Sequence, residues 1–271
     1  MIKHTEHRDT ENTCKSSWRV PVLRYCSVPA SSLATAARGS VPACRLSEQL
    51  AHIRERGWLL LGVTEALNHV YSHSSDRVVA LTFDGGLLDF LNAWSVLNDM
   101  GAGATLYVPV ESVGSRVSRW DRGFSRLGWE QLESLSEEGV ELGIQLVGRY
   151  GLDHGRVANK SAVDKGLVES RANTRVSSFC LATKRTRIPP DVRHALTHVG
   201  CDTACTLRRG VSRSGEDKFA MPRIPITMND SGEAVHELIR QDKLSLRSIV
   251  ERAPRWSDWR RDSTEKIRMS H

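Results

Sequence analysis

The sequence lacks any apolar run of the roughly 20 residues that a membrane span needs, so we expect no transmembrane helix. Residues 1–18 are polar and charged, without the apolar core of a secretory signal. Six cysteines are present but no Cys-x-x-Cys pair, which argues against a zinc ribbon. Together these absences predict a cytoplasmic protein whose cysteines are reduced thiols.

A strong excess of one charge is also absent. Lys and Arg number 38 against 32 Asp and Glu, giving a net charge of +6 with both signs mixed along the chain. This mixture argues against a nucleic-acid binder. The clearest basic clusters lie in the Arg- and Trp-rich stretch 240–271. A basic module whose end contacts phosphates is therefore one alternative to weigh.

The hydrophobic pattern alternates between predicted strands and predicted helices, which indicates an α/β fold with a parallel sheet. Strict alternation over this length favours a (β/α) barrel. We predict a flexible polar tail at 1–18, the barrel at 19–239 and a C-terminal extension at 240–271. The expected strands are 20–25, 58–61, 78–83, 104–110, 140–144, 176–181 and 203–207; the expected helices are 47–57, 65–71, 87–101, 129–138, 163–173 and 191–199.

Asp84 follows the clearest predicted strand and precedes Gly85 and Gly86, which permit a tight turn. In parallel α/β folds, functional groups gather at the C-terminal ends of strands. Asp84 is therefore the first candidate functional residue. The alternative is that it only caps the following helix, a common role of Asp.

Several short motifs appear in an order and spacing that resemble the polysaccharide deacetylase (NodB-homology) family. They lie at 21–25, 47–58, 80–86, 104–105, 128–132, 139–143, 200–204 and 222–224, and so extend over most of residues 20–226. The resemblance implies a distorted, incomplete (β/α) barrel. It also implies an enzyme that removes N-acetyl, sometimes O-acetyl, groups from amino-sugar polymers or glycolipids.

By this resemblance, a divalent metal would be held by one Asp and two His beside an Asp that acts as general base. Asp84 matches the base, but the three ligand positions carry Gly85, Gln145 and Arg149. Gln is a weak neutral ligand, and Arg cannot bind a metal because it stays protonated. We therefore expect no cofactor, or zinc or another divalent metal only if the site is retained in another form.

The resemblance suggests further pocket residues, namely Gly86, Tyr25 and Arg223, and places Cys26 where the family has a His. Arg149 could form an ion pair with Asp84 that replaces the charge of the metal.

A metal could also have moved elsewhere in the chain. The pairs His69/His73 and His194/His198 have the one-turn spacing that can bind Zn²⁺, but we expect both to face solvent. Cys201 and Cys205 are expected in the core rather than as reactive thiols.

Two principal hypotheses about function remain. The first is a catalytically impaired, deacetylase-like protein that binds an N-acetylated amino sugar, another glycan or a partner glycan-processing enzyme. The second is an active N-deacetylase, or another hydrolase of non-peptide carbon–nitrogen bonds, with a non-standard site around Asp84.

Overall fold

The computed structural model describes residues 18–31, 39–73, 76–109, 113–115, 125–146, 176–181, 186–198 and 200–241. The strands are β1 Arg19–Val20, β2 Val22–Tyr25, β3 Leu59–Leu61, β4 Val78–Asp84, β5 Thr105–Val108, β6 Glu141–Leu146, β7 Val176–Leu181, β8 Thr203–Arg209, β9 Ser212–Arg213 and β10 Met221–Pro225. The helices are α1 Ala43–Arg54, α2 Val63–Ser72, α3 Phe90–Asp99, α4 Trp129–Glu137, α6 Pro190–His198 and α7 Gly232–Arg240.

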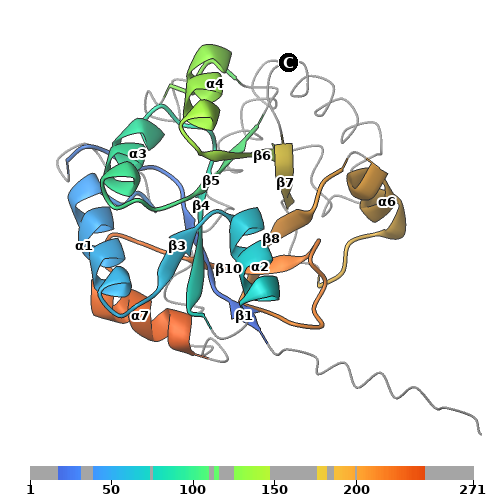
Figure 1. The fold of residues 1–271 in the computed structure, drawn as a ribbon. Helices are drawn as coiled ribbons and strands as arrows, with labels where there is room; N and C mark the ends of the chain where they lie inside the picture. Colours follow the sequence, from blue (N-terminus) through green and yellow to red (C-terminus); the bar gives the residue numbers. More distant parts are fainter. Residues whose placement is uncertain are drawn as a thin grey trace, which may run out of the picture.

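Seven parallel strands close into a barrel in the order β2-β10-β8-β7-β6-β5-β4, and pairing of β4 with β2 completes the ring. Strand β3 extends the sheet by pairing with β4 outside this ring. Helices α1, α3, α4, α6 and α7 lie around the strands, whereas α2 lies over the ring in the view of Figure 1. The predicted α/β fold of the distorted (β/α) barrel type is therefore confirmed.

Alternate residues of each strand enter different cores, as the two-residue period of a strand requires. In β4, Val79, Leu81 and Phe83 pack in the layer between the strands and the outer helices. Val78 and Ala80 instead join a separate cluster with the buried face of α2. A strand that is buried on both faces explains why 78–83 is a nearly continuous apolar run.

Helix α2 packs its apolar face onto residues of the barrel interior. Its buried residues Val63, Ala66, Leu67 and Val70 share a cluster with interior residues such as Cys205. This arrangement fills one end of the barrel with hydrocarbon, and polar interior side chains lie nearer the C-terminal ends of the strands.

Tyr107 fills the middle of the barrel because Gly143 leaves room for its ring. Tyr107 is fully buried, and its hydroxyl lies 2.7 Å from Ser178 Oγ. A Cβ atom at Gly143 would lie 2.5 Å from two carbons of the Tyr107 ring, closer than real Cβ contacts come. The glycine of the motif 139–143 thus permits a close approach of side chain to backbone.

Some element details differ from the sequence-based expectations. Helix α1 begins at Ala43 rather than near 47, and β10 and α7 complete the fold beyond the predicted elements. The core face of α3 is formed by Phe90, Ala93, Trp94 and Leu97. Leu88 and Leu91 do not share this face and are 37% and 41% exposed, because Leu88 precedes the helix and Leu91 lies on its outer side.

The predicted helix 163–173 lies outside the described residues, as do residues 1–17 of the predicted tail 1–18 and nearly all of the extension 240–271. None of the helices within the described ranges is long and apolar enough to cross a membrane.

We predict that Gly143→Ala lowers the free energy of unfolding by about 1–3 kcal/mol, the usual cost of overpacking a filled core. The cause would be the clash between the added methyl group and the Tyr107 ring. Denaturant unfolding of the single and double variants with Tyr107→Ala measures the coupling. In the Tyr107→Ala background, Gly143→Ala should lower the free energy of unfolding by at least about 0.5 kcal/mol less than it does in wild type. An equal loss in the two backgrounds would contradict this explanation.

Candidate functional site

Asp84 ends β4 at the C-terminal end of the barrel and is only 4% exposed. Both of its carboxylate oxygens accept hydrogen bonds from Arg223 of β10, at 2.6 Å for Oδ1 and 3.0 Å for Oδ2. A second guanidinium lies nearby, with Arg24 Nε 3.8 Å from Asp84 Oδ2. One carboxylate and two guanidiniums therefore form the charged centre of this end of the barrel.

Arg223 uses all of its donors within the barrel. Besides Asp84, it donates from Nε to the Thr206 carbonyl oxygen at 3.1 Å, and from its terminal nitrogens to Thr82 Oγ1 at 3.2 Å and Cys180 Sγ at 3.0 Å. Burial alone would lower the pKa of Arg223, but the Asp84 carboxylate raises it above its ordinary value. This guanidinium is thus held charged and in one geometry, with five N–H groups engaged.

Neutral side chains complete the described part of this site. Burial raises the pKa of Cys26 although Arg24 acts to lower it, and burial likewise raises the pKa of Cys180. Both thiols are therefore protonated near neutral pH. Gln145, the register neighbour of Cys180 on β6, is 4% exposed, and its Oε1 atom has no hydrogen-bond partner.

The turn after Asp84 depends on two glycines with positive φ. Gly85 has φ +104° and Gly86 has φ +57°, values that side-chain-bearing residues rarely adopt. Arg126 donates from a terminal nitrogen to the Gly85 carbonyl oxygen, and Leu127 donates its amide to Gly86 at 2.9 Å. The position that matches a metal-binding Asp in the resemblance is therefore shaped for glycine.

The predicted site residues are only partly brought together. Asp84 and Arg223 are in direct contact, and Gly85 and Gly86 form the adjacent turn. Gln145 pairs in register with Cys180, and the Cys180 sulfur accepts a hydrogen bond from Arg223. Arg149, with its proposed ion pair to Asp84, lies outside the described residues.

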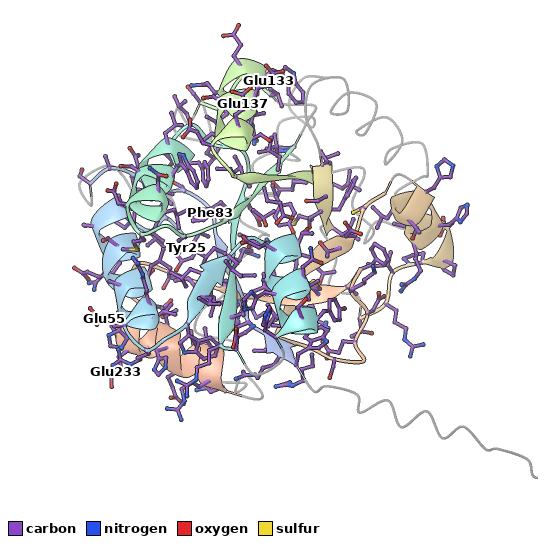
Figure 2. All side chains as sticks on the ribbon, viewed as in Figure 1. Tyr25, Glu55, Phe83, Glu133, Glu137 and Glu233 are labelled. Atoms are coloured by element: carbon purple, nitrogen blue, oxygen red, sulfur yellow. The ribbon has the colours of Figure 1, made fainter. Side chains whose placement is uncertain are left out.

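Tyr25 is not part of this cluster, contrary to its assignment as a pocket residue. It lies in the outer core, stacked on Phe83 with ring centroids 5.2 Å apart, and its hydroxyl donates to Gln49 Oε1 of α1 at 3.4 Å. Figure 2 shows Tyr25 and Phe83 inside the molecule, whereas the labelled glutamates lie at its periphery. The reason is strand alternation: Arg24 points toward Asp84, so its neighbour Tyr25 points the other way.

Arg24 is the site residue that the sequence analysis does not single out. It is 8% exposed and lies within the four residues of β2, whose other members are apolar or aromatic. A charged residue inside such a run is an available signal, because a buried charge needs a partner in the fold.

The donor set at this end does not fit the metal that the resemblance implies. Gly85 has no side chain, Gln145 is a neutral amide and position 149 is an Arg. Across the described ranges, no group of three or more His, Cys, Asp or Glu side chains could hold a metal ion. The histidine pairs behave as predicted, since His73, His194 and His198 are exposed and His69 bonds Asp76 on the surface at 2.7 Å. Cys201 and Cys205 are buried, as expected.

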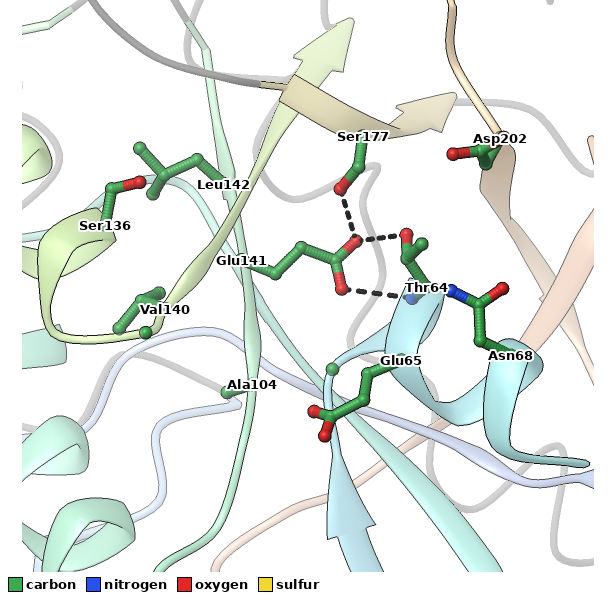
Figure 3. A pocket seen from close by; sticks show the side chains of 12 residues that line it. Thr64, Glu65, Asn68, Ala104, Ser136, Val140, Glu141, Leu142, Ser177 and Asp202 are labelled. Carbon is green, nitrogen blue, oxygen red and sulfur yellow. Dashed lines mark hydrogen bonds between the residues drawn. The ribbon is translucent and has the colours of Figure 1, made fainter. Parts of the chain in front are cut away.

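A pocket of about 440 Å³ lies at the opposite end of the strands from Asp84. At its wall, Glu141 Oε1 accepts hydrogen bonds from the Thr64 hydroxyl at 2.6 Å and from Ser177 Oγ at 2.9 Å, while Oε2 accepts from the Thr64 amide at 3.0 Å (Figure 3). Thr64 lies in the first turn of α2, whose N-cap is Gly62. Glu141 ties this turn to β6 and β7.

Comparison with known proteins supports the fold. No protein-family model matches the sequence, and no curated protein matches it. Among solved structures, IcaB from Ammonifex degensii is similar with a TM-score of 0.66 at 21% identity, over 82% of this chain and 97% of that one. The deacetylase PplD of Streptococcus pyogenes, solved with acetate, has a TM-score of 0.64 at 19% identity, over 82% and 99%. BC0361, a polysaccharide deacetylase from Bacillus cereus, has a TM-score of 0.61 at 18% identity, over 83% of this chain and 70% of that one. The chain therefore has the fold of polysaccharide deacetylases.

We predict that Asp84→Asn lowers the free energy of unfolding by about 3–5 kcal/mol, because it leaves buried guanidinium charge without its carboxylate. Urea unfolding at neutral pH measures the loss. The matched control is Asp76→Asn, which breaks the surface contact with His69 and should cost about 0–1 kcal/mol. Equal losses in the two variants would contradict a central role for the Asp84–Arg223 pair.

The contribution of Glu141 to stability depends on pH. Burial raises the pKa of Glu141 above its ordinary value of 4.5, although hydrogen bonds from Thr64 act to lower it. A raised pKa in the folded state means that the contribution of Glu141 to stability is full below 4.5 and is lost as pH rises through the folded-state pKa. Denaturant unfolding of wild type and Glu141→Gln from pH 4 to 8 should therefore show the variant gaining relative stability as pH rises. Glu137→Gln, an exposed carboxylate on α4, is the control, and a pH-independent difference for Glu141→Gln would contradict the prediction.

Proposed function

We propose that this protein is a deacetylase-like carbohydrate-binding protein, which binds an N-acetylated amino sugar or a related glycan at the C-terminal end of its barrel without metal-dependent deacetylation. A separate enzyme would then act on the bound glycan. The proposal combines a fold shared with polysaccharide deacetylases and a polar site at the barrel end where such folds carry function.

The observation that carries the proposal is the double hydrogen bond between Asp84 and Arg223. A general base needs a free carboxylate lone pair facing the proton that it removes. Both Asp84 oxygens accept from Arg223, and the side chain is almost fully buried. Each oxygen keeps a further lone pair, but a carboxylate that is held by Arg223 and almost fully buried has little access to the water that a base must activate.

The donor set supports the same conclusion. Amide hydrolysis by a metal enzyme needs a cation that activates water and polarises the carbonyl group. Gly85 and Gln145 are poor substitutes for the ligands that would hold such an ion. Gln145 can still serve binding, because a buried amide oxygen with no partner is able to accept a hydrogen bond from a sugar hydroxyl or acetamide N–H.

We predict that N-acetylglucosamine oligomers bind the protein in calorimetric titration, with no acetate released in the presence of Zn²⁺, Co²⁺ or Mn²⁺. Gln145→Leu should weaken binding about tenfold by removing one buried hydrogen bond to the ligand. Glu133→Gln, on the outer helix α4, is the control and should bind as wild type does. Metal-dependent acetate release that disappears in Asp84→Ala would overturn the proposal, as would failure of every oligomer to bind.

A further inference from the structure

The charges of the cluster around Asp84 do not balance among Arg24, Arg223 and Asp84 themselves. Arg24 and Arg223 each carry one positive charge and share the single carboxylate of Asp84. Cys26 and Cys180 have raised pKa values and remain neutral, and Gln145 carries no charge. The described cluster therefore holds one buried positive charge in excess, an arrangement that costs free energy unless an anion compensates it.

The unbalanced cation is Arg24 rather than Arg223. All five N–H groups of Arg223 are engaged, and it forms both of the hydrogen bonds to the Asp84 oxygens. Arg24 is 8% exposed, and its Nε has no hydrogen-bond partner, because Asp84 Oδ2 is 3.8 Å away. The guanidinium, which also forms a side-chain hydrogen bond with Cys26, thus keeps one donor, Nε, without a hydrogen-bond partner beside Asp84.

An unused acceptor lies at the same end of the barrel. Gln145 Oε1 is buried without a partner, and Gln145 pairs in register with Cys180, whose sulfur accepts from Arg223. Buried polar atoms without partners are rare in folded proteins, and each one needs an explanation. An occupant that brings both a negative oxygen and a hydroxyl donor would satisfy Arg24 and Gln145 together.

We infer that this end of the barrel recognises a carboxylate-bearing sugar of the uronic acid class, with Arg24 as the residue that selects the carboxylate and Gln145 accepting from a sugar hydroxyl. Guanidinium and carboxylate are matched in shape and charge, so this pair gives strong, directed hydrogen bonds. The inference rests on the proposed function and narrows it from glycans in general to acidic ones.

The test compares three ligands by calorimetric titration into the full chain: a disaccharide of glucuronic acid and N-acetylglucosamine, its neutral counterpart N,N′-diacetylchitobiose, and sodium acetate. We expect the acidic disaccharide to bind at least about tenfold more tightly than the neutral one, because one charged hydrogen bond adds about that much affinity. Its affinity should also fall as salt is raised from 50 to about 500 mM, more steeply than that of the neutral sugar.

Arg24→Gln should remove this preference, lowering affinity for the acidic disaccharide about tenfold while changing that for the neutral one less than about twofold. The matched control is Arg45→Gln, an exposed arginine that pairs with Glu48 on α1 and should leave both affinities unchanged. If Arg24→Gln does not fold, the wild-type comparison of the acidic and neutral sugars decides.

The outcomes separate this inference from the proposed function. Equal binding of acidic and neutral disaccharides overturns the inference and leaves a glycan-binding function standing. Failure of both sugars to bind overturns both. Acetate that binds as tightly as the acidic disaccharide shows recognition of a free carboxylate, which contradicts the uronic acid assignment.

Discussion

The structure of this site depends on one buried ion pair, in which Asp84 at the end of β4 accepts two hydrogen bonds from Arg223 of β10. Strands β4 and β10 are not neighbours, because β2 lies between them in the closed ring. The pair therefore bridges the barrel interior, and Arg223 extends the bridge to β7 through Cys180. An interaction of this kind requires strict geometry, since a buried charge that loses its partner is costly.

The barrel interior is arranged in layers that make this pair possible. Hydrocarbon from α2 fills one end, the Tyr107 ring occupies the middle above Gly143, and the charged cluster lies at the C-terminal end of the strands. The Arg223 guanidinium lies 5.5 Å from the centre of the Tyr107 ring, so the aromatic layer also supports the charge. The polar groups of the site thus rest on a packed apolar base, which keeps them in one arrangement.

Fold class and the position of Asp84 could be predicted because both depend on local pattern. Strand and helix alternation, a buried strand at 78–83 and the glycine turn after it are all visible in the chain order. The partner of Asp84 could not be predicted in this way, because Arg223 is 139 residues away and Arg149 was an equally reasonable candidate by motif. Tyr25 was placed in the pocket for the same reason: a motif match does not say which face of a strand a residue occupies.

The sequence by itself determined that this chain forms a (β/α) barrel and that Gly85, Gln145 and Arg149 stand where the resemblance places metal ligands, because periodicity belongs to short stretches of sequence and residue chemistry to single positions. Only the tertiary structure decided that both oxygens of Asp84 accept from Arg223, that Arg24 Nε is left without a hydrogen-bond partner, and that Gln145 Oε1 is left without a donor. Ring closure sets which strands become neighbours, and this neighbourhood decides whether a buried charge is paired. For this protein, the chemistry of the site follows from those pairings.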